Sequence, residues 1–158
     1  MRPPIGETSD TSQASRSWLL LLPLALCLHV AEEWRGGFIT WASSTLGVEI
    51  EPSRFVWINL VGLVLLSSAV VAAIVFRPLL WMAATVAALL VTNALIHVGL
   101  SVAFAVYSPG AITGGLLYLP IGGRALWTLS RVLPRGVLPG SVLAGIALHA
   151  LATIVAMG

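Results

Sequence analysis

Two glutamates and a histidine lie together at the end of an apolar run, in the segment Leu28-His29-Val30-Ala31-Glu32-Glu33. The chain has only six acidic residues, and the other four lie in polar or loop-like stretches. An ionisable side chain inside a membrane segment costs about 3 kcal/mol to insert, so it is a functional-site candidate by default. On a helix, the i,i+3 and i,i+4 spacings place His29, Glu32 and Glu33 on one face.

Two more histidines and an asparagine are expected at a similar depth in the membrane. A helix rises about 1.5 Å per residue, and counting from the inner end of each expected helix gives depths of about 18 to 27 Å. The residues in this range are His29, Glu32, Glu33, Asn93, His97 and His149. The shared depth predicts one polar site in the outer half of the bilayer. The alternative is a set of buried hydrogen bonds that join helices.

Imidazole and carboxylate groups are the ligands that zinc and non-haem iron prefer. The expected metal ligands are His29, Glu33, His97 and His149. Glu32 is the expected catalytic base, with His29 and Glu33 also in the catalytic set, and Asn93 is a supporting residue. Carboxylate-bridged di-iron sites use about four glutamates and two histidines, so one divalent metal, zinc or iron, fits this chain better than two.

Three functions are compatible with these residues. The first is an integral membrane enzyme that acts on a lipid-like or other hydrophobic small substrate. The ligand types favour a metal-dependent reaction. Whether its chemistry is hydrolytic or redox stays open. The second is a metal-free His/Glu acid–base isomerase or cyclase on a sterol-like or isoprenoid-like substrate, since burial raises a carboxylate pKa toward useful values. The third is a non-enzymatic binding or transport protein, although no inverted repeat is visible.

The composition is that of an integral membrane protein. Of 158 residues, 58% are hydrophobic and 9% are charged, and the mean hydropathy is +1.00. Soluble domains have about 25% charged residues. The chain has eight arginines and no lysine. They are scattered, which argues against nucleic-acid binding. The expected partners are therefore membrane lipids and a hydrophobic small molecule, and no partner protein is indicated.

Apolar segments separated by Pro and Gly account for most of the chain. The five segments are residues 18–33, 55–76, 79–107, 111–129 and 137–157. Segments of this length predict an all-α integral membrane protein, a compact bundle of about five transmembrane helices. Residues 1–15 are expected to be a disordered tail, and residues 16–158 a single transmembrane helical domain. The linker 36–54 is either a short interfacial helix or a plain loop.

The arginines predict an orientation. With the N-terminus inside, six of them fall on the inner side and two on the outer side. This asymmetry favours an inside N-terminus and, with five spans, an outside C-terminus. Within the fourth segment, Gly114-Gly115 and Gly122-Gly123 are expected to permit close helix packing. That segment is not expected to carry a catalytic residue.

The motif residues resemble those of a known family. His29-Val30-Ala31-Glu32-Glu33 is followed by Asn93 and His97, four residues apart, and then by Tyr107-Ser108-Pro109-Gly110. In kind and order these motifs resemble the bacterial family of small membrane proteins named for its HXXEE motif. The resemblance implies a multi-span protein of a bacterial cytoplasmic membrane, but no particular reaction. It adds Tyr107 as a supporting site residue; the other interpretation of Tyr107 is an interfacial anchor.

Overall fold

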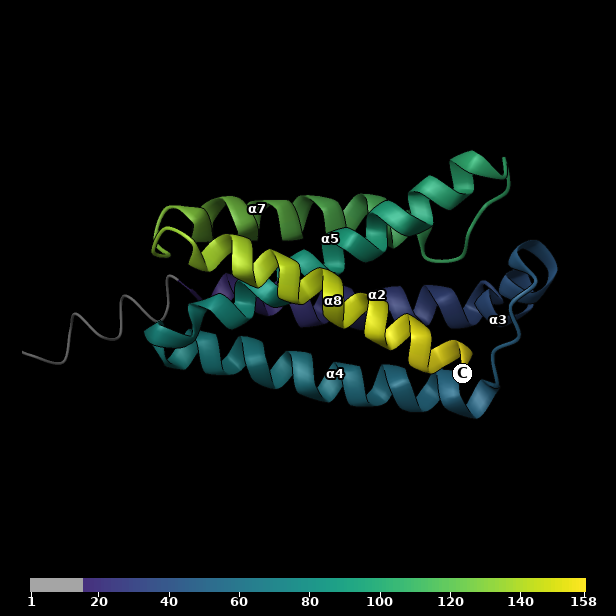
Figure 1. Cartoon of the computed structure of the whole chain (residues 1–158), viewed down its shortest axis with the longest axis horizontal. Helices are drawn as coiled ribbons and strands as arrows, with labels where there is room; N and C mark the ends of the chain where they lie inside the picture. The colour runs from purple at the N-terminus through teal and green to yellow at the C-terminus, as the bar shows by residue number, and fades with distance from the viewer. Residues whose placement is uncertain (1–15) are drawn as a thin grey trace, which may run out of the picture.

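The computed structural model describes residues 16–158, and the predicted disordered tail lies outside this range. The described residues form helices and no strand, which confirms the all-α prediction. The long elements are η1 (Ser17–Leu20) with α2 (Leu21–Arg35), α4 (Pro52–Val75), η3 (Arg77–Leu79) with α5 (Leu80–Ala103), and α8 (Val137–Met157). Between α5 and α8 lie α6 (Ala111–Thr113), η4 (Gly114–Tyr118) and α7 (Leu119–Ser130). They pack side by side as an elongated bundle (Figure 1).

The number of candidate membrane spans in residues 16–158 is four, whereas the sequence predicts about five. Among the described residues, four helices are long and apolar enough to cross a membrane: Ser17–Arg35, Pro52–Val75, Arg77–Phe104 and Val137–Met157. The fifth expected segment is helical over α6, η4 and α7 and packs along α5. Its four glycines, Pro120 and Arg124 make it less apolar than the four candidate spans. Its hydrophobicity therefore does not by itself mark it as a span.

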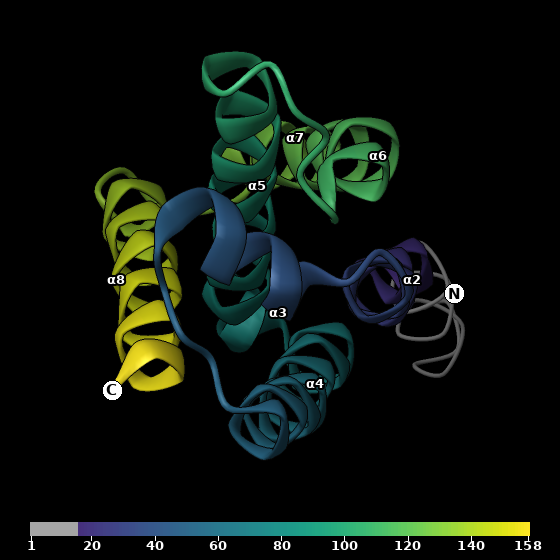
Figure 2. The same ribbon diagram turned by 90° about the vertical axis from the view of Figure 1, so that its right-hand side faces the viewer.

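Helix α5 is the centre of the bundle. It contacts α2, α4, α7 and α8, and an end-on view shows these helices arranged around it (Figure 2). Half of its most apolar window is buried, a larger share than in the other candidate spans. Small residues such as Ala83, Ala87 and Ala94 are fully buried on it. Small side chains let neighbouring helices approach closely, which is how helices associate where no water drives them together.

The first glycine of each predicted pair in the fourth segment makes a close contact with α5. A Cβ atom at Gly122 would lie 2.8 Å from Val91 Cγ2 and 3.1 Å from the Ala87 carbonyl oxygen. A Cβ at Gly114 would lie 3.3 Å from the Ala94 Cα atom. By contrast, a Cβ at Gly123 would meet nothing within 4 Å. Only one member of the second pair is therefore needed for packing.

A Gly122→Leu variant is expected to give much less folded protein than Gly123→Leu. The new side chain at position 122 must push α7 away from α5, and overpacking of this kind typically costs about 1–3 kcal/mol. At position 123 the side chain extends into open space. The measurement is the yield of the monodisperse peak in size-exclusion chromatography after detergent extraction. Equal yields for the two variants would show that α7 does not need its close approach to α5.

The linker between α2 and α4 forms a short helical cap. It contains α3 (Phe38–Trp41) and η2, a π-helical turn (Ala42–Leu46), so the helical alternative for this linker is the correct one. Trp41, Ala42 and Ile50 pack with Phe55 of α4 in a small apolar cluster. The end-on view shows α3 crossing the end of the bundle (Figure 2). The cap therefore covers one end of the space between the helices.

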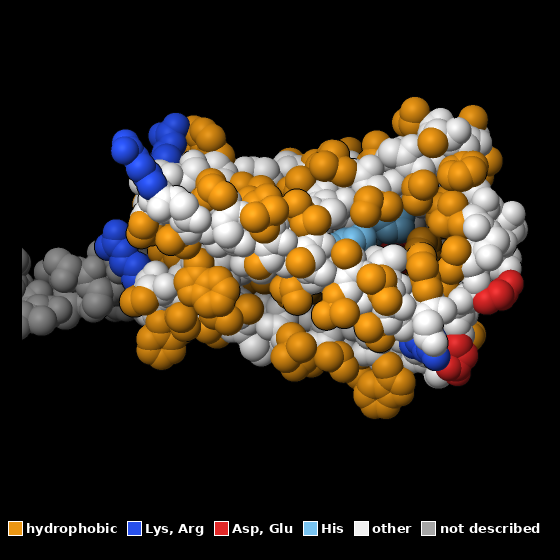
Figure 3. Space-filling view, in the orientation of Figure 1, with side chains coloured by type: hydrophobic (Ala, Val, Ile, Leu, Met, Phe, Trp, Pro, Cys, Tyr) orange, Lys and Arg blue, Asp and Glu red, His pale blue; other side chains and the backbone are white. Residues whose placement is uncertain are grey.

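Charged side chains gather at the two ends of the bundle (Figure 3). Arg77 follows α4, and Arg131 and Arg135 lie between α7 and α8. Glu49 and Glu51 lie at the opposite end, just before α4. Exposed apolar side chains cover the sides of the bundle between these ends. The sides therefore match a hydrocarbon environment, whereas the direction of insertion stays a prediction.

Candidate metal site at the capped end of the bundle

Three ionisable side chains from two helices converge below the cap. His29 and Glu33 lie one turn apart on α2, and His97 lies on α5. The three residues are 2%, 6% and 4% exposed, respectively. Glu33 Oε1 lies 3.4 Å from His29 Nε2 and 3.2 Å from His97 Nε2. Two imidazoles thus face one carboxylate oxygen in a site that excludes solvent.

The separations fit a single metal ion. The three ligand atoms all lie within 4.8 Å of one another. Two ligand atoms each about 2.1 Å from a tetrahedral zinc ion are about 3.4 Å apart. The two Glu33–histidine distances are close to that value. His29 Nε2 is moreover buried, and among the described residues it faces the Glu33 carboxylate at 3.4 Å without forming a hydrogen bond; a metal ion between the two would satisfy both groups.

Two hydroxyl groups hold the far sides of the imidazole rings. His29 Nδ1 lies 2.8 Å from Thr113 Oγ1, and His97 Nδ1 lies 3.0 Å from Ser108 Oγ. The Thr113 hydroxyl also donates to the Gly110 carbonyl at 3.5 Å. It can therefore accept a hydrogen bond from His29 Nδ1, which leaves a lone pair on Nε2. Metal-bound histidines typically donate their other ring N–H in this way.

The segment after α5 folds back over the histidines. Ser108 is fully buried, and a Cβ atom at Gly110 would lie 2.7 Å from His29 Cε1 and 2.9 Å from His97 Nδ1. Gly110 also has φ +105°, a backbone conformation that glycine adopts without steric penalty. The Tyr-Ser-Pro-Gly motif thus does more than end a helix: it positions the groups that contact both imidazoles.

Glu32 binds this segment and not the cluster. Its carboxylate accepts hydrogen bonds from the Gly110, Ile112 and Thr113 N–H groups at 3.0, 3.0 and 2.7 Å. The Tyr107 hydroxyl donates to it at 2.5 Å. Burial, followed by this hydrogen bond, raises the pKa of Tyr107 to about 12, so the phenol stays protonated near neutral pH. Both Glu32 oxygens are engaged, which disagrees with its expected role as a free base.

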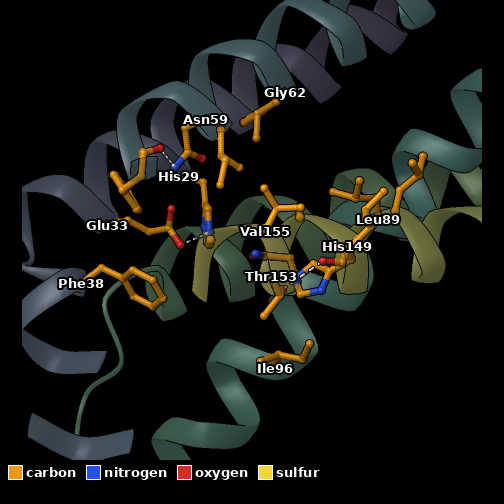
Figure 4. A pocket seen from close by; sticks show the side chains of 18 of the residues that line it. His29, Glu33, Phe38, Asn59, Gly62, Leu89, Ile96, His149, Thr153 and Val155 are labelled. Atoms are coloured by element: carbon orange, nitrogen blue, oxygen red, sulfur yellow. Dashed lines mark hydrogen bonds and ion pairs between the residues drawn. The ribbon is translucent and has the colours of Figure 1, made fainter. Parts of the chain in front are cut away.

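His149 and Asn93 line the same cavity but lie outside the cluster. His149 lies on α8 and is only partly buried, and it is not part of the group of close ligand atoms. The close-up shows its ring at the cavity wall, apart from Glu33 and His29 (Figure 4). Asn93 lies one turn before His97 on α5, and its Oδ1 atom is buried without a partner. The structure thus unites three of the four expected metal ligands.

Tyr118 is a site residue that the sequence did not reveal. Its ring stacks on His29, with 4.4 Å between the centroids and 28° between the planes. Its hydroxyl is buried without a hydrogen-bond partner. The residue ends the π-helical turn η4, and such turns are frequent at functional sites. In the sequence, one tyrosine among apolar residues is indistinguishable from a core residue.

A large apolar cavity adjoins the cluster. Its volume is about 580 Å³, within the range of roughly 300–1,000 Å³ that is usual for small-molecule sites. The walls come from α2, α4, α5, α8 and the cap. In the space-filling view, histidine surface is visible inside a hollow bordered by apolar side chains (Figure 3). The buried cluster is thus connected to the apolar surface of the bundle.

A family of known sequences matches most of the chain. The family described as "Protein of unknown function with HXXEE motif" matches residues 20–128. This range includes the cluster, the folded-back segment and Tyr118, whereas His149 lies beyond it. No curated protein and no solved structure matches the chain.

Proposed function

Because the chain belongs to the HXXEE-motif family, whose function is unknown, we propose from the site itself that the protein is a membrane-embedded metal-dependent enzyme. One divalent metal ion is held between His29, Glu33 and His97. The observation that carries this proposal is the approach of both histidine Nε2 atoms to one Glu33 oxygen, at 3.4 and 3.2 Å. The buried His29 Nε2 atom without a hydrogen-bond partner supports it.

Three protein ligands would leave a coordination position of the metal ion free for water or substrate. Catalytic zinc sites have three protein ligands and an open position, and two histidines with one carboxylate also form the open iron site of many oxygenases. An open position here adjoins the cavity, because all three ligands line it. Such a metal ion polarises a substrate oxygen or lowers the pKa of bound water. Zinc and iron are both compatible with this ligand set.

The surrounding residues receive roles from their contacts. Ser108 and Thr113 orient the two imidazoles through Nδ1. Glu32 is a positioning residue, since its hydrogen bonds fix the segment that carries Gly110 and Thr113. His149 lines the cavity outside the ligand set, so we assign proton exchange with the substrate to it.

The setting of the site supports a hydrophobic substrate. The sides of the bundle are apolar, and the cavity is open toward them. The arginine-rich end matches the inner side of a bacterial cytoplasmic membrane, which gives an inside N-terminus and a site in the outer half of the bilayer. Residues 16–158 form a single transmembrane domain in this proposal, and membrane lipids are its immediate partners.

The metal content of detergent-purified protein tests the proposal. After incubation with zinc or iron and removal of excess ion, mass spectrometry is expected to find one metal ion per chain in the wild type. A His29→Ala variant is expected to retain less than about a tenth as much, since metal affinity drops about 10–100-fold even when only a supporting contact is lost. His149→Ala is the matched control and is expected to keep its metal.

Two results would contradict this proposal. A metal-free wild type after incubation would favour the metal-free alternative, in which both histidines donate to Glu33. Equal metal loss in His149→Ala and His29→Ala would mean that α8 supplies a ligand. Both variants must elute as the wild type does in size-exclusion chromatography.

A further inference from the structure

We propose that the cavity binds a neutral long-chain alcohol, with its hydroxyl group between Asn93 and Tyr118. This inference rests on the proposed function, because it identifies the substrate class of the same site. Three features of the cavity support it: an apolar wall that reaches the lipid-facing surface, the absence of arginine and lysine from the wall, and the buried oxygen atoms of Asn93 and Tyr118, which have no hydrogen-bond partner among the described residues.

The apolar wall continues onto the outside of the bundle. Trp57, Val61 and Leu65 of α4 line the cavity and are also exposed. On α8 the same is true of Leu151 and Val155. Exposed side chains on membrane-spanning helices face lipid tails. The cavity is therefore open sideways, between α4 and α8, to molecules dissolved in the bilayer.

The cap closes the other approach. Phe38, Trp41 and Ile50 line the cavity at the end of the bundle and pack with Phe55. A molecule that comes from the aqueous side would have to displace this apolar cluster. A long apolar chain that comes from the bilayer displaces only other lipid tails. The geometry thus favours a substrate with a long hydrocarbon part.

The wall that the structure describes contains no arginine or lysine side chain that could pair with an anionic head group. Among the described residues that line the cavity there is no arginine, and the chain has no lysine. Glu33 is the only carboxylate in this wall. In metal-free protein, a phosphate or carboxylate head group would be buried beside the Glu33 carboxylate with no arginine or lysine to pair with it, which is unfavourable. The binding site in the metal-free protein therefore favours a neutral polar end.

Two atoms define the polar group of the substrate. Among the described residues, four buried polar side-chain atoms lack a hydrogen-bond partner, and all four belong to residues that line the cavity. Two of them are nitrogen atoms, of His29 and Trp41, and the two oxygen atoms are Asn93 Oδ1 and the Tyr118 hydroxyl. Both residues line the cavity beside the cluster. A hydroxyl group donates one hydrogen bond and accepts others. An alcohol can therefore donate to Asn93 and accept from Tyr118, whereas a methyl ether can only accept.

The test is photolabelling of the full chain in detergent by three matched probes. A long-chain alcohol, its methyl ether and the corresponding carboxylic acid each carry a diazirine in the hydrocarbon chain. All measurements use chelator-treated protein, so they do not depend on a bound metal. The alcohol is expected to label with an affinity roughly tenfold higher than the ether, the size of one hydrogen bond in a buried site. Labelled peptides are expected from α4 and α8.

Asn93→Leu is expected to abolish the preference for the alcohol over the ether. Asn59→Leu is the matched control: Asn59 also lines the cavity, but its amide donates to the Phe55 carbonyl at 3.0 Å. Tyr118→Phe, which removes only one oxygen atom, provides a second variant if Asn93→Leu does not fold. It is expected to weaken labelling by the alcohol and the ether alike.

Equal labelling by the alcohol and the ether in the wild type would overturn this inference. So would stronger labelling by the acid, which would point to an anionic lipid. These outcomes leave the metal measurement unaffected. Conversely, if the wild type bound the alcohol but no metal, the alcohol-binding site would be supported and the metal-dependent function would be contradicted.

Discussion

A Gly110→Ala variant is expected to be recovered at a small fraction of the wild-type yield and without bound metal. The added Cβ would lie 2.7 Å from His29 Cε1 and 2.9 Å from His97 Nδ1, too close to both imidazoles. The φ of +105° is also unfavourable for any residue with a Cβ. One methyl group therefore disturbs the two histidine ligands and the backbone that supports them. Yield and metal content per folded chain are the measurements.

Gly136→Ala separates the two effects of that substitution. Gly136 has φ +92°, so alanine suffers a similar backbone strain there, but its Cβ would meet nothing within 4 Å. This control is expected to fold less well than the wild type, by about 1–2 kcal/mol, and to bind its metal normally. Normal metal binding in folded Gly110→Ala would show that the imidazoles do not need their observed positions.

Removal of the metal is expected to lower the apparent Tm of the wild type by about 8–16 °C. A ligand present at about 1,000 times its Kd stabilises the folded state by about 4 kcal/mol. For a chain of this size, about 1 kcal/mol shifts Tm by about 2–4 °C. Glu33→Gln keeps the shape of the side chain and removes the charged ligand. Its Tm is expected to be unchanged by a chelator, as followed by tryptophan fluorescence during heating.

The starting stability of Glu33→Gln adds a second comparison. In metal-free protein, Glu33 is a buried carboxylate that faces two imidazoles. Glutamine keeps an oxygen that accepts hydrogen bonds and removes a charge whose burial is costly. Chelator-treated wild type is therefore expected to be no more stable than Glu33→Gln. A wild type that keeps its Tm in a chelator while Glu33→Gln is strongly destabilised would indicate a metal-free hydrogen-bond role for the carboxylate.

Most of the fold could be predicted because apolar length and helix-breaking residues are local properties of the sequence. The last predicted segment coincides with α8, and the second differs from α4 by a few residues at its start. The difference concerned the fourth segment, which is helical and packs closely against α5 at Gly114 and Gly122 but is not strongly apolar. A stretch can therefore run the length of a bundle although its hydropathy does not identify it as a span.

For residues on different helices, the sequence could predict only the depth of the site along the helix axes. Counting residues gives depth along a helix, and depth brought His29, Glu33 and His97 to one level. It does not give the rotation of each helix about its axis, and this rotation decides which neighbouring helix a side chain faces. His149 accordingly lies at the cavity wall and outside the close ligand group. The same limit applies to Glu32, which is adjacent to Glu33 but reaches a different partner.

The Tyr-Ser-Pro-Gly motif drew attention to the segment after α5, but the contacts of Ser108 and Tyr118 could not be predicted from the sequence. Ser108 reaches His97 because the chain reverses over the end of α5, and a reversal of this kind depends on tertiary packing. Tyr118 required knowledge of the π-helical turn that directs its ring onto His29. Depth and motif spacing can be counted only along a regular α-helix. Ser108 lies in the segment after α5 and Tyr118 in a π-helical turn, so such counting does not place them.

The sideways opening of the cavity determines how a rate should be measured. A site that takes its substrate from the bilayer experiences the mole fraction of that substrate among the lipids, and not its molarity in the whole sample. Adding inert lipid at constant total substrate would then slow turnover, whereas adding buffer would leave it unchanged. A KM for the proposed activity is accordingly expressed as the mole fraction of substrate among the membrane lipids. Those lipids meet the cavity at Trp57, Leu65 and Val155.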